Sequence, residues 1–211
     1  DTVYNPTRRF LAGTLGRYGV TARYFDPADD AETIRSMITP KTRVIFLESP
    51  GSLSFEMQDI PAIAAMAKEA GIMTVIDNTW AAGVLFKPLD HGVDVSIQSL
   101  TKYVCGHSDV FMGLAAAKGH AADLLASSSY ETGWAVSPDD AYMAIRGLRT
   151  LHTRLAHHGA AALKVAQWLE HQPEVHSVMC PALPGDPGHA IWKRDFTDIW
   201  CLLGAVLHPT T

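Results

Sequence analysis

The sequence predicts an α/β protein, built on a mostly parallel sheet with helices on both faces. Three short apolar runs, at 43–48, 73–76 and 93–97, have the length and near-continuous hydrophobicity of strands that are covered on both sides. A helical pattern at about 60–70 separates the first two runs. This alternation is typical of parallel sheets, because parallel neighbours need a crossover connection. In such sheets functional groups gather beyond the carboxyl ends of the strands.

The first strand and its crossover helix are marked by the residues at their ends. The run 43–48 stops at Ser-Pro-Gly and is expected to be a central parallel strand. Asp59 then predicts a helix N-cap, with Pro61 in the first turn and Gly71 just past the end. The expected apolar face of this helix is Ile60, Ile63, Ala64 and Ala67.

The second half of the chain predicts one more strand and a long helix. The strand is expected at 110–117, and a capping box that begins at Ser137 opens the helix. Pro173 should end the helical pattern, and we expect a break in it near Gly159. The predicted apolar stripe is Ala141, Ile145, Leu148, Leu151 and Leu155.

The domain boundary is expected within this helical region. We assign 1–152 to a large domain, and 153–211 to a linking helix followed by the start of a smaller C-terminal α+β domain. A strand at 175–178 and a turn-rich loop at 181–188 belong to the second part. So few residues cannot form an independent core of ordinary size, which predicts an incomplete domain.

Composition favours small-molecule chemistry. The formal charge of -5 comes from 17 basic and 22 acidic residues with no long single-sign run, so we expect neither a nucleic-acid partner nor an anionic membrane surface. No apolar run approaches the roughly 18 residues of a membrane helix. Cys105, Cys180 and Cys201 form no CxxC pair and the histidines form no HExxH motif, which argues against disulfides and a metal site. A cytoplasmic location is the simplest expectation.

Polar residues follow the three predicted strands, namely Glu48, Asp77 and Lys102, and the hydroxyls of Ser99 and Thr101 flank the lysine. A lysine in an apolar site can form a Schiff base because desolvation makes its neutral amine available. The pattern alone favours the alternative, a strand-end lysine that extends to water. Hydroxyls can bind a phosphate, and a carboxylate can keep a heterocyclic nitrogen protonated. Together the groups match the needs of pyridoxal 5'-phosphate.

Three longer strings carry a specific resemblance. They are ESPGS at 48–52, VIDNTWAAGVLFKPLDHGVDVSIQSLTKYVCGHSD at 75–109 and RGLRTLHTRLAHH at 146–158. With these strings, and over about 1–197, the chain resembles the cysteine and methionine metabolism family of pyridoxal-phosphate-dependent enzymes. The resemblance implies fold type I, the aspartate aminotransferase-like fold.

The resemblance also implies roles for five residues. Lys102 would carry the cofactor and act as the catalytic base, and Asp77 would pair with the ring nitrogen. Ser99 and Thr101 would contact the phosphate. Tyr4 would stack on the cofactor ring and is a second catalytic candidate; without the resemblance, a core aromatic beside a turn is the preferred interpretation of Tyr4. Cys105 is expected to be a packed residue, as a free cysteine usually is.

Smaller differences favour the bacterial β-lyase branch of the family. Its γ-acting members typically carry ESPTNP and DNTF, where this chain has ESPGSL and DNTWAAG. The β-lyase resemblance implies α,β-elimination of L-cystathionine to homocysteine, pyruvate and ammonia, in methionine biosynthesis, with cystine or other S-substituted cysteines as further substrates. Trp80 and Ser52 mark the branch and can also be packing residues. A γ-acting cystathionine γ-synthase or γ-lyase, and a non-catalytic fragment, stay open.

Several parts that the resemblance leads one to expect cannot be located. These are a glycine-containing phosphate loop, a tyrosine and an arginine that reach the neighbouring subunit's site, and an arginine for the substrate carboxylate. We therefore expect a fragment of a longer enzyme, which the resemblance implies is a homotetramer built as a dimer of dimers. The end, 198–211, departs from the family pattern after KRDFT, as a truncated, frameshifted or chimeric sequence would.

Overall fold

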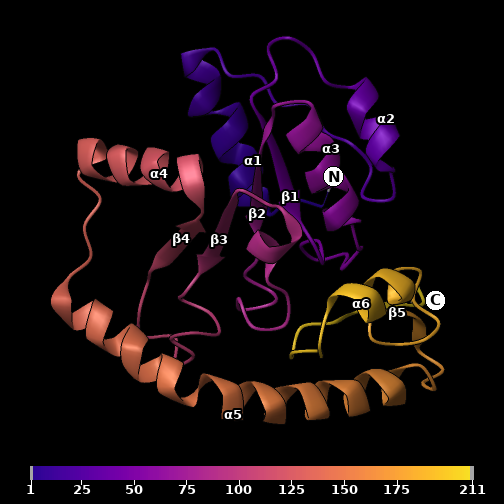
Figure 1. Ribbon diagram of the computed structural model, residues 1–211. Coiled ribbons are helices and arrows are strands. Elements are labelled where there is room, and N and C mark those ends of the chain that lie inside the picture. The colour runs from indigo at the N-terminus through magenta and orange to yellow at the C-terminus, as the bar shows by residue number, and fades with distance from the viewer. Residues whose placement is uncertain (1, 210–211) are drawn as a thin grey trace.

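The structure is a computed structural model that describes residues 2–209. Its main sheet has four strands in the order β1 (Val44–Glu48), β2 (Met73–Asp77), β3 (Val95–Ser99) and β4 (Gly113–Ala117) (Figure 1). The first three strands are parallel and β4 is antiparallel to β3. The mostly parallel α/β fold predicted from the sequence is therefore confirmed, with an antiparallel edge strand.

Four short helices belong to the N-terminal part of the chain. They are α1 (Asn5–Ala12), the 3-10 helix η1 (Leu15–Tyr18), α2 (Ala31–Ser36) and α3 (Ile60–Glu69). The 3-10 helix η2 (Pro88–His91) precedes β3, and α4 (Gly119–Thr132) follows β4. In Figure 1, α1, α2 and α3 lie together on the side opposite the long helix α5 (Pro138–Leu169).

Both predicted helix caps are confirmed. The Asp59 carboxylate accepts a hydrogen bond of 3.2 Å from the Ala62 backbone N–H, and the Ser137 hydroxyl accepts one of 3.0 Å from the Asp140 N–H. Each side chain satisfies one of the N–H groups that the first helical turn leaves without a partner. The expected apolar face of α3 is buried together with Met66.

Helix α5 is continuous, so the predicted break near Gly159 is wrong. A side chain at Gly159 would collide with the backbone carbonyl oxygen of Ile199, and one at Gly147 would collide with that of Val104. Glycine costs about 1 kcal/mol relative to alanine inside a helix, but here it permits close packing between α5 and two neighbouring segments.

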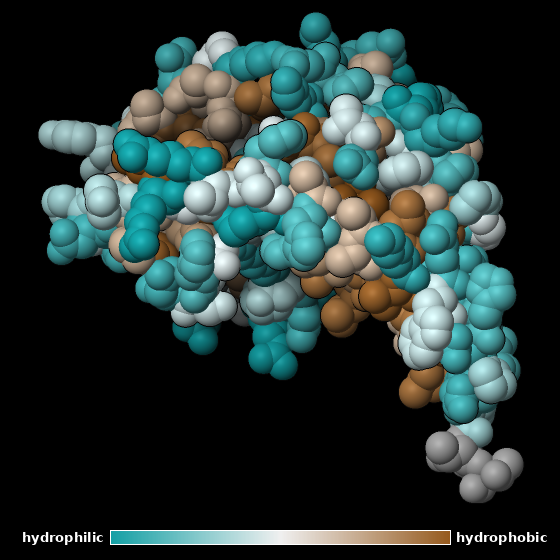
Figure 2. Space-filling view, turned by 90° about the horizontal axis from the view of Figure 1, so that it is seen from below, coloured by the Kyte–Doolittle hydropathy of each residue, from teal (hydrophilic) through white to brown (hydrophobic). Residues whose placement is uncertain are grey.

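The predicted stripe of α5 is also partly wrong. Leu151 and Leu155 are buried as expected, but Ile145 and Leu148 are exposed. The buried face uses small residues instead, namely Ala144, Gly147, Gly159, Ala162 and Ala166. The prediction assumed that the large apolar side chains would be buried, whereas α5 packs closely on its neighbours through small residues. Figure 2, which looks from below at the side along which α5 runs in Figure 1, shows apolar surface among polar residues there.

The C-terminal segment packs onto the same core. It contains β5 (Val175–Met179), α6 (His189–Asp195) and β6 (Gly204–Leu207), with β5 and β6 antiparallel. The predicted strand at 175–178 is confirmed, whereas α6 and β6 were not predicted. Ile199 and Trp200, within the unusual end of the sequence, are buried in the cluster that also contains residues of α3. The boundary between 1–152 and 153–211 stays a prediction.

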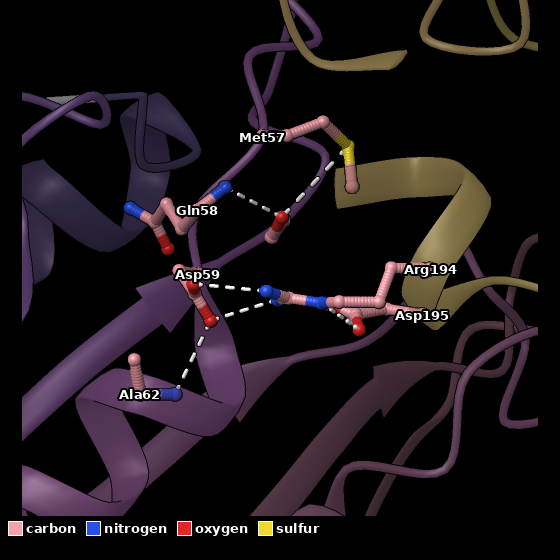
Figure 3. Close-up of polar contacts among 7 residues, drawn as sticks. Met57, Gln58, Asp59, Ala62, Arg194 and Asp195 are labelled. Carbon is pink, nitrogen blue, oxygen red and sulfur yellow. Dashed lines mark hydrogen bonds and ion pairs between the residues drawn. The ribbon is translucent and has the colours of Figure 1, made fainter. Parts of the chain in front are cut away.

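Arg194 of α6 joins this segment to the cap of α3 (Figure 3). Its Nη1 and Nη2 atoms donate to the two carboxylate oxygens of Asp59 at 3.0 and 2.8 Å, and its Nε donates to Asp195 at 2.7 Å. The hydrogen bond from Arg194 holds the pKa of Asp59 below its ordinary value. The Asp59 carboxylate thus caps α3 and binds α6, and Asp59 directly follows Gln58 in the chain.

Candidate active site

The strand register brings the candidate residues to one edge of the sheet. Glu48 ends β1 and pairs in register with Asp77, which ends β2, while Asp77 pairs with Ile97 near the end of β3. Ser99 is the last residue of β3, and Lys102 lies in the turn that follows. Because β1, β2 and β3 are parallel, their carboxyl ends meet at the same edge, as predicted.

Tyr4 reaches this edge from the other end of the chain. It is the N-cap residue of α1, and the Lys102 Nζ lies 5.2 Å from the centroid of its ring. This distance is within the range of a cation–π contact. The Tyr4 backbone N–H donates a hydrogen bond of 2.8 Å to Oε2 of Glu48. The five residues selected from the sequence therefore share one region of the molecule, together with Glu48.

The exposure of two residues distinguishes between the alternatives considered for them. Lys102 is exposed, as expected for a strand-end lysine that extends to water, because the turn at 101–105 places its amine beyond the end of β3. Tyr4 is 44% exposed, so the interpretation as a core aromatic is wrong. The open ring and the open amine lie beside each other, and both are accessible to a ligand from solvent.

Asp77 keeps one carboxylate oxygen available. Its Oδ1 accepts a hydrogen bond of 2.9 Å from the Thr79 backbone N–H, and the Thr79 hydroxyl in turn accepts one of 2.9 Å from the Ser99 N–H. Within residues 2–209, no hydrogen bond engages Oδ2. The two bonds fix the ends of β2 and β3 relative to each other and hold the carboxylate in place.

The two hydroxyls beside Lys102 differ in what they already bind. The Thr101 hydroxyl donates to the Met112 carbonyl at 3.2 Å and accepts from the Met112 N–H at 2.9 Å. The Ser99 hydroxyl has no hydrogen-bond partner among the described residues. Because a hydroxyl has a single proton to donate, Ser99 can donate to a phosphate directly, whereas Thr101 would first have to release Met112.

Glu48 is the residue of this edge that received no role from the sequence. Burial raises its pKa to about 7; the Tyr4 N–H and Lys102 favour the charged form, while Asp77 opposes it. A carboxyl group that titrates near neutral pH, close to an amine and a second carboxylate, is characteristic of functional sites. The available signal was its place at the end of the first strand, the counterpart of Asp77 on the second.

Other candidate groups have structural positions. Cys105 is buried, which raises its pKa and leaves it a packed residue, as predicted. Trp80 is buried with its ring edge-on to Phe196 at 5.9 Å, and its Nε1–H donates to the Leu202 carbonyl at 3.3 Å. Over the described part of the chain, no three potential metal ligands cluster. No helix there is long and apolar enough to span a bilayer.

The geometry fits pyridoxal phosphate. An accessible lysine amine, an aromatic ring beside it, a carboxylate with one oxygen without a partner and a hydroxyl with no partner supply four different contacts. They suit, respectively, an aldehyde, a flat heterocycle, a protonated ring nitrogen and a phosphate. Fold and candidate site are thus those of an α/β protein whose residues around Lys102 suit this cofactor.

Comparison with known proteins identifies the family. The model of the Cys/Met metabolism PLP-dependent enzymes matches residues 1–208, and the chain belongs to this family. The match extends into the unusual C-terminal end. The cofactor of the family is pyridoxal phosphate, and the fold is type I.

Individual relatives agree with this assignment. The chain is 46% identical to cystathionine beta-lyase of Escherichia coli over 209 residues, which cover 98% of the chain and 53% of the relative. It is 49% identical to cystathionine beta-lyase of Salmonella typhimurium over 212 residues, covering 99% and 53%. A crystal structure of cystathionine gamma-lyase from Lactobacillus plantarum complexed with L-serine superposes with a TM-score of 0.93 at 32% identity, covering 99% and 55%. The chain spans about half the length of these relatives.

Proposed function

We propose that this sequence belongs to a carbon–sulfur β-lyase that cleaves L-cystathionine and water to homocysteine, pyruvate and ammonia. The observation that carries the proposal is the placement of Lys102 Nζ 5.2 Å from the Tyr4 ring, with Asp77 at the same sheet edge. The β-type reaction is supported by the names of the two enterobacterial relatives and by the strings ESPGS and DNTWAAG.

The cofactor would be held by five residues. Lys102 would bind its aldehyde carbon, Tyr4 would cover the ring, and Asp77 would keep the ring nitrogen protonated. Ser99 would donate to the phosphate, and Thr101 would join it if its bond to Met112 were exchanged. When bound, pyridoxal phosphate supplies an electron sink for the bond pair released at the substrate Cα.

The remaining steps are proton transfers by residues of this chain. Once the substrate amine has displaced it from the cofactor, the Lys102 amine would be free to remove the Cα proton as a general base. The sulfur at Cβ then leaves with the electron pair of the C–S bond and needs one proton. Lys102 or the Tyr4 hydroxyl would supply it, since the Lys102 amine and the Tyr4 ring lie beside each other.

A second candidate is a γ-acting lyase. The observation in its favour is the match in fold to the Lactobacillus plantarum cystathionine gamma-lyase. A γ-elimination of cystathionine breaks the other C–S bond and yields 2-oxobutyrate and cysteine. The two candidates use the same cofactor and differ in the C–S bond that is broken and in the products.

The test is a product assay with pyridoxal phosphate and L-cystathionine. Pyruvate with homocysteine is expected; 2-oxobutyrate with cysteine would replace the proposal by the γ-acting reading. A Lys102→Ala variant should form neither product, and Lys68→Ala, which removes an exposed lysine of α3, should be unaffected. Cofactor binding without any product would favour the non-catalytic fragment.

A further inference from the structure

Residues 2–4 are attached to the site by the segment Glu48–Ser52, which we call the ESPGS turn. The Tyr4 N–H donates to Oε2 of Glu48 at 2.8 Å, and the Ser52 N–H donates to the Thr2 carbonyl at 2.8 Å. Thr2 is buried. A side chain at Gly51 would collide with the Thr2 side chain, so the two segments are in direct contact.

The ESPGS turn is itself fixed to the core. The Glu48 N–H donates to Oε1 of Gln58 at 3.2 Å, and the Gln58 N–H donates to the Ser49 hydroxyl at 3.0 Å. Gln58 is buried, and the residue after it is Asp59, which Arg194 holds (Figure 3). The Glu48 side chain therefore projects from a supported backbone.

Tyr4 has few other attachments. Its carbonyl accepts hydrogen bonds from the Thr7 and Arg8 N–H groups, which start α1, but its side chain forms no capping bond. Helix α1 contributes no buried residue. The contacts of residues 2–4 with the ESPGS turn therefore attach the backbone on the N-terminal side of the Tyr4 ring, and the bond to Glu48 is made by Tyr4 itself.

We propose that Glu48 is a positioning residue that holds Tyr4 beside Lys102 by accepting the Tyr4 backbone N–H. The inference deepens the proposed function and rests on it, because Tyr4 is expected to cover the cofactor ring. The charged groups that face Glu48 are Asp77 on β2 and Lys102 in the turn after β3. Glu48 acts on the reaction through Tyr4 and is not itself expected to touch the substrate.

The first experiment measures the attachment without cofactor. Hydrogen exchange of the peptide that contains residues 2–10 is compared in the native protein, Glu48→Gln and Glu48→Ala. Gln keeps an oxygen that can accept the Tyr4 N–H, whereas Ala has none. We expect faster exchange in Glu48→Ala and near-native exchange in Glu48→Gln. Glu56→Gln, which changes an exposed carboxylate close by, is the control.

The second experiment is a double-mutant cycle on pyridoxal phosphate affinity, read from the cofactor's absorbance and circular dichroism. Glu48→Ala should weaken affinity roughly tenfold, the size expected for the loss of one hydrogen bond. In a Tyr4→Ala background the same change should cost less than about twofold, because coupled residues are not additive. Tyr4→Ala is compatible with folding, since the ring is half exposed and caps nothing.

A third variant separates the loss of this attachment from a general loss of folded structure. Gly51→Ala leaves every charged group in place, but its new methyl group would collide with the Thr2 side chain. It should therefore also speed the exchange of residues 2–10 and weaken cofactor affinity. Adding Thr2→Gly removes the colliding side chain and should reverse both changes. The proposal is overturned if Glu48→Ala weakens the cofactor equally with and without the Tyr4 ring, or if Gln behaves like Ala. A protein that never binds the cofactor would refute the proposed function, while the exchange experiment would still decide whether Glu48 holds Tyr4.

Discussion

The pH dependence of stability should carry the signature of Glu48. Burial raises its pKa from 4.5 to about 7, so the folded protein binds this proton more tightly than the unfolded chain does. The stabilising contribution of the protonated group is complete below pH 4.5. The free energy of unfolding falls as the pH rises from 4.5 to about 7, and above that pH this group changes it no further.

The magnitude follows from the shift. The rise from 4.5 to about 7 corresponds to about 3 kcal/mol by linkage, and since the side chain is only partly buried we discount this to roughly 2 kcal/mol. Urea unfolding between pH 5 and 8 measures it as a fall in the free energy of unfolding. Glu48→Gln should remove that fall, and Glu56→Gln should retain it. Identical pH slopes for the native protein and Glu48→Gln would refute the reasoning.

Three further predictions concern the site and the core. Asp77→Asn should lower the lyase rate roughly 10- to 100-fold while the cofactor still binds, because a charged hydrogen bond to the ring is replaced by a neutral one; an unchanged rate constant would contradict this. Leu155→Ala should lower the free energy of unfolding in urea by about 3 kcal/mol, since Leu155 is fully buried; a loss under 1 kcal/mol would contradict the packing of α5. Arg194→Ala should cost about 2 kcal/mol because it leaves the buried Asp195 carboxylate without its partner, whereas Arg35→Ala, which breaks only exposed pairs, should cost less than about 1 kcal/mol. Equal losses in the two arginine variants would show that α6 is not held in this way.

The parallel strands and the two capped helices could be predicted because their signals are local. Apolar runs, Asp59 and Ser137 act within a few residues, and the structure reproduces them. The buried face of α5 could not be predicted in the same way. It depends on glycine and alanine in contact with segments far along the chain, such as Gly159 with Ile199.

The same distinction applies to the site. Lys102 and Asp77 follow strands and were found from that position, and Tyr4 followed from the family resemblance. The attachment of Tyr4 to Glu48 was not predicted. It depends on residues 44 positions apart in the sequence, which only the fold brings into contact.

The central claim is that Lys102 carries the cofactor, and covalent labelling tests it most directly. The protein is incubated with pyridoxal phosphate, reduced with borohydride, digested and mapped by mass spectrometry. The account predicts that the reduced phosphopyridoxyl group is on Lys102 and that Lys102→Ala lacks it. A label on a different lysine, or equal labelling of the native protein and Lys102→Ala, would contradict the account.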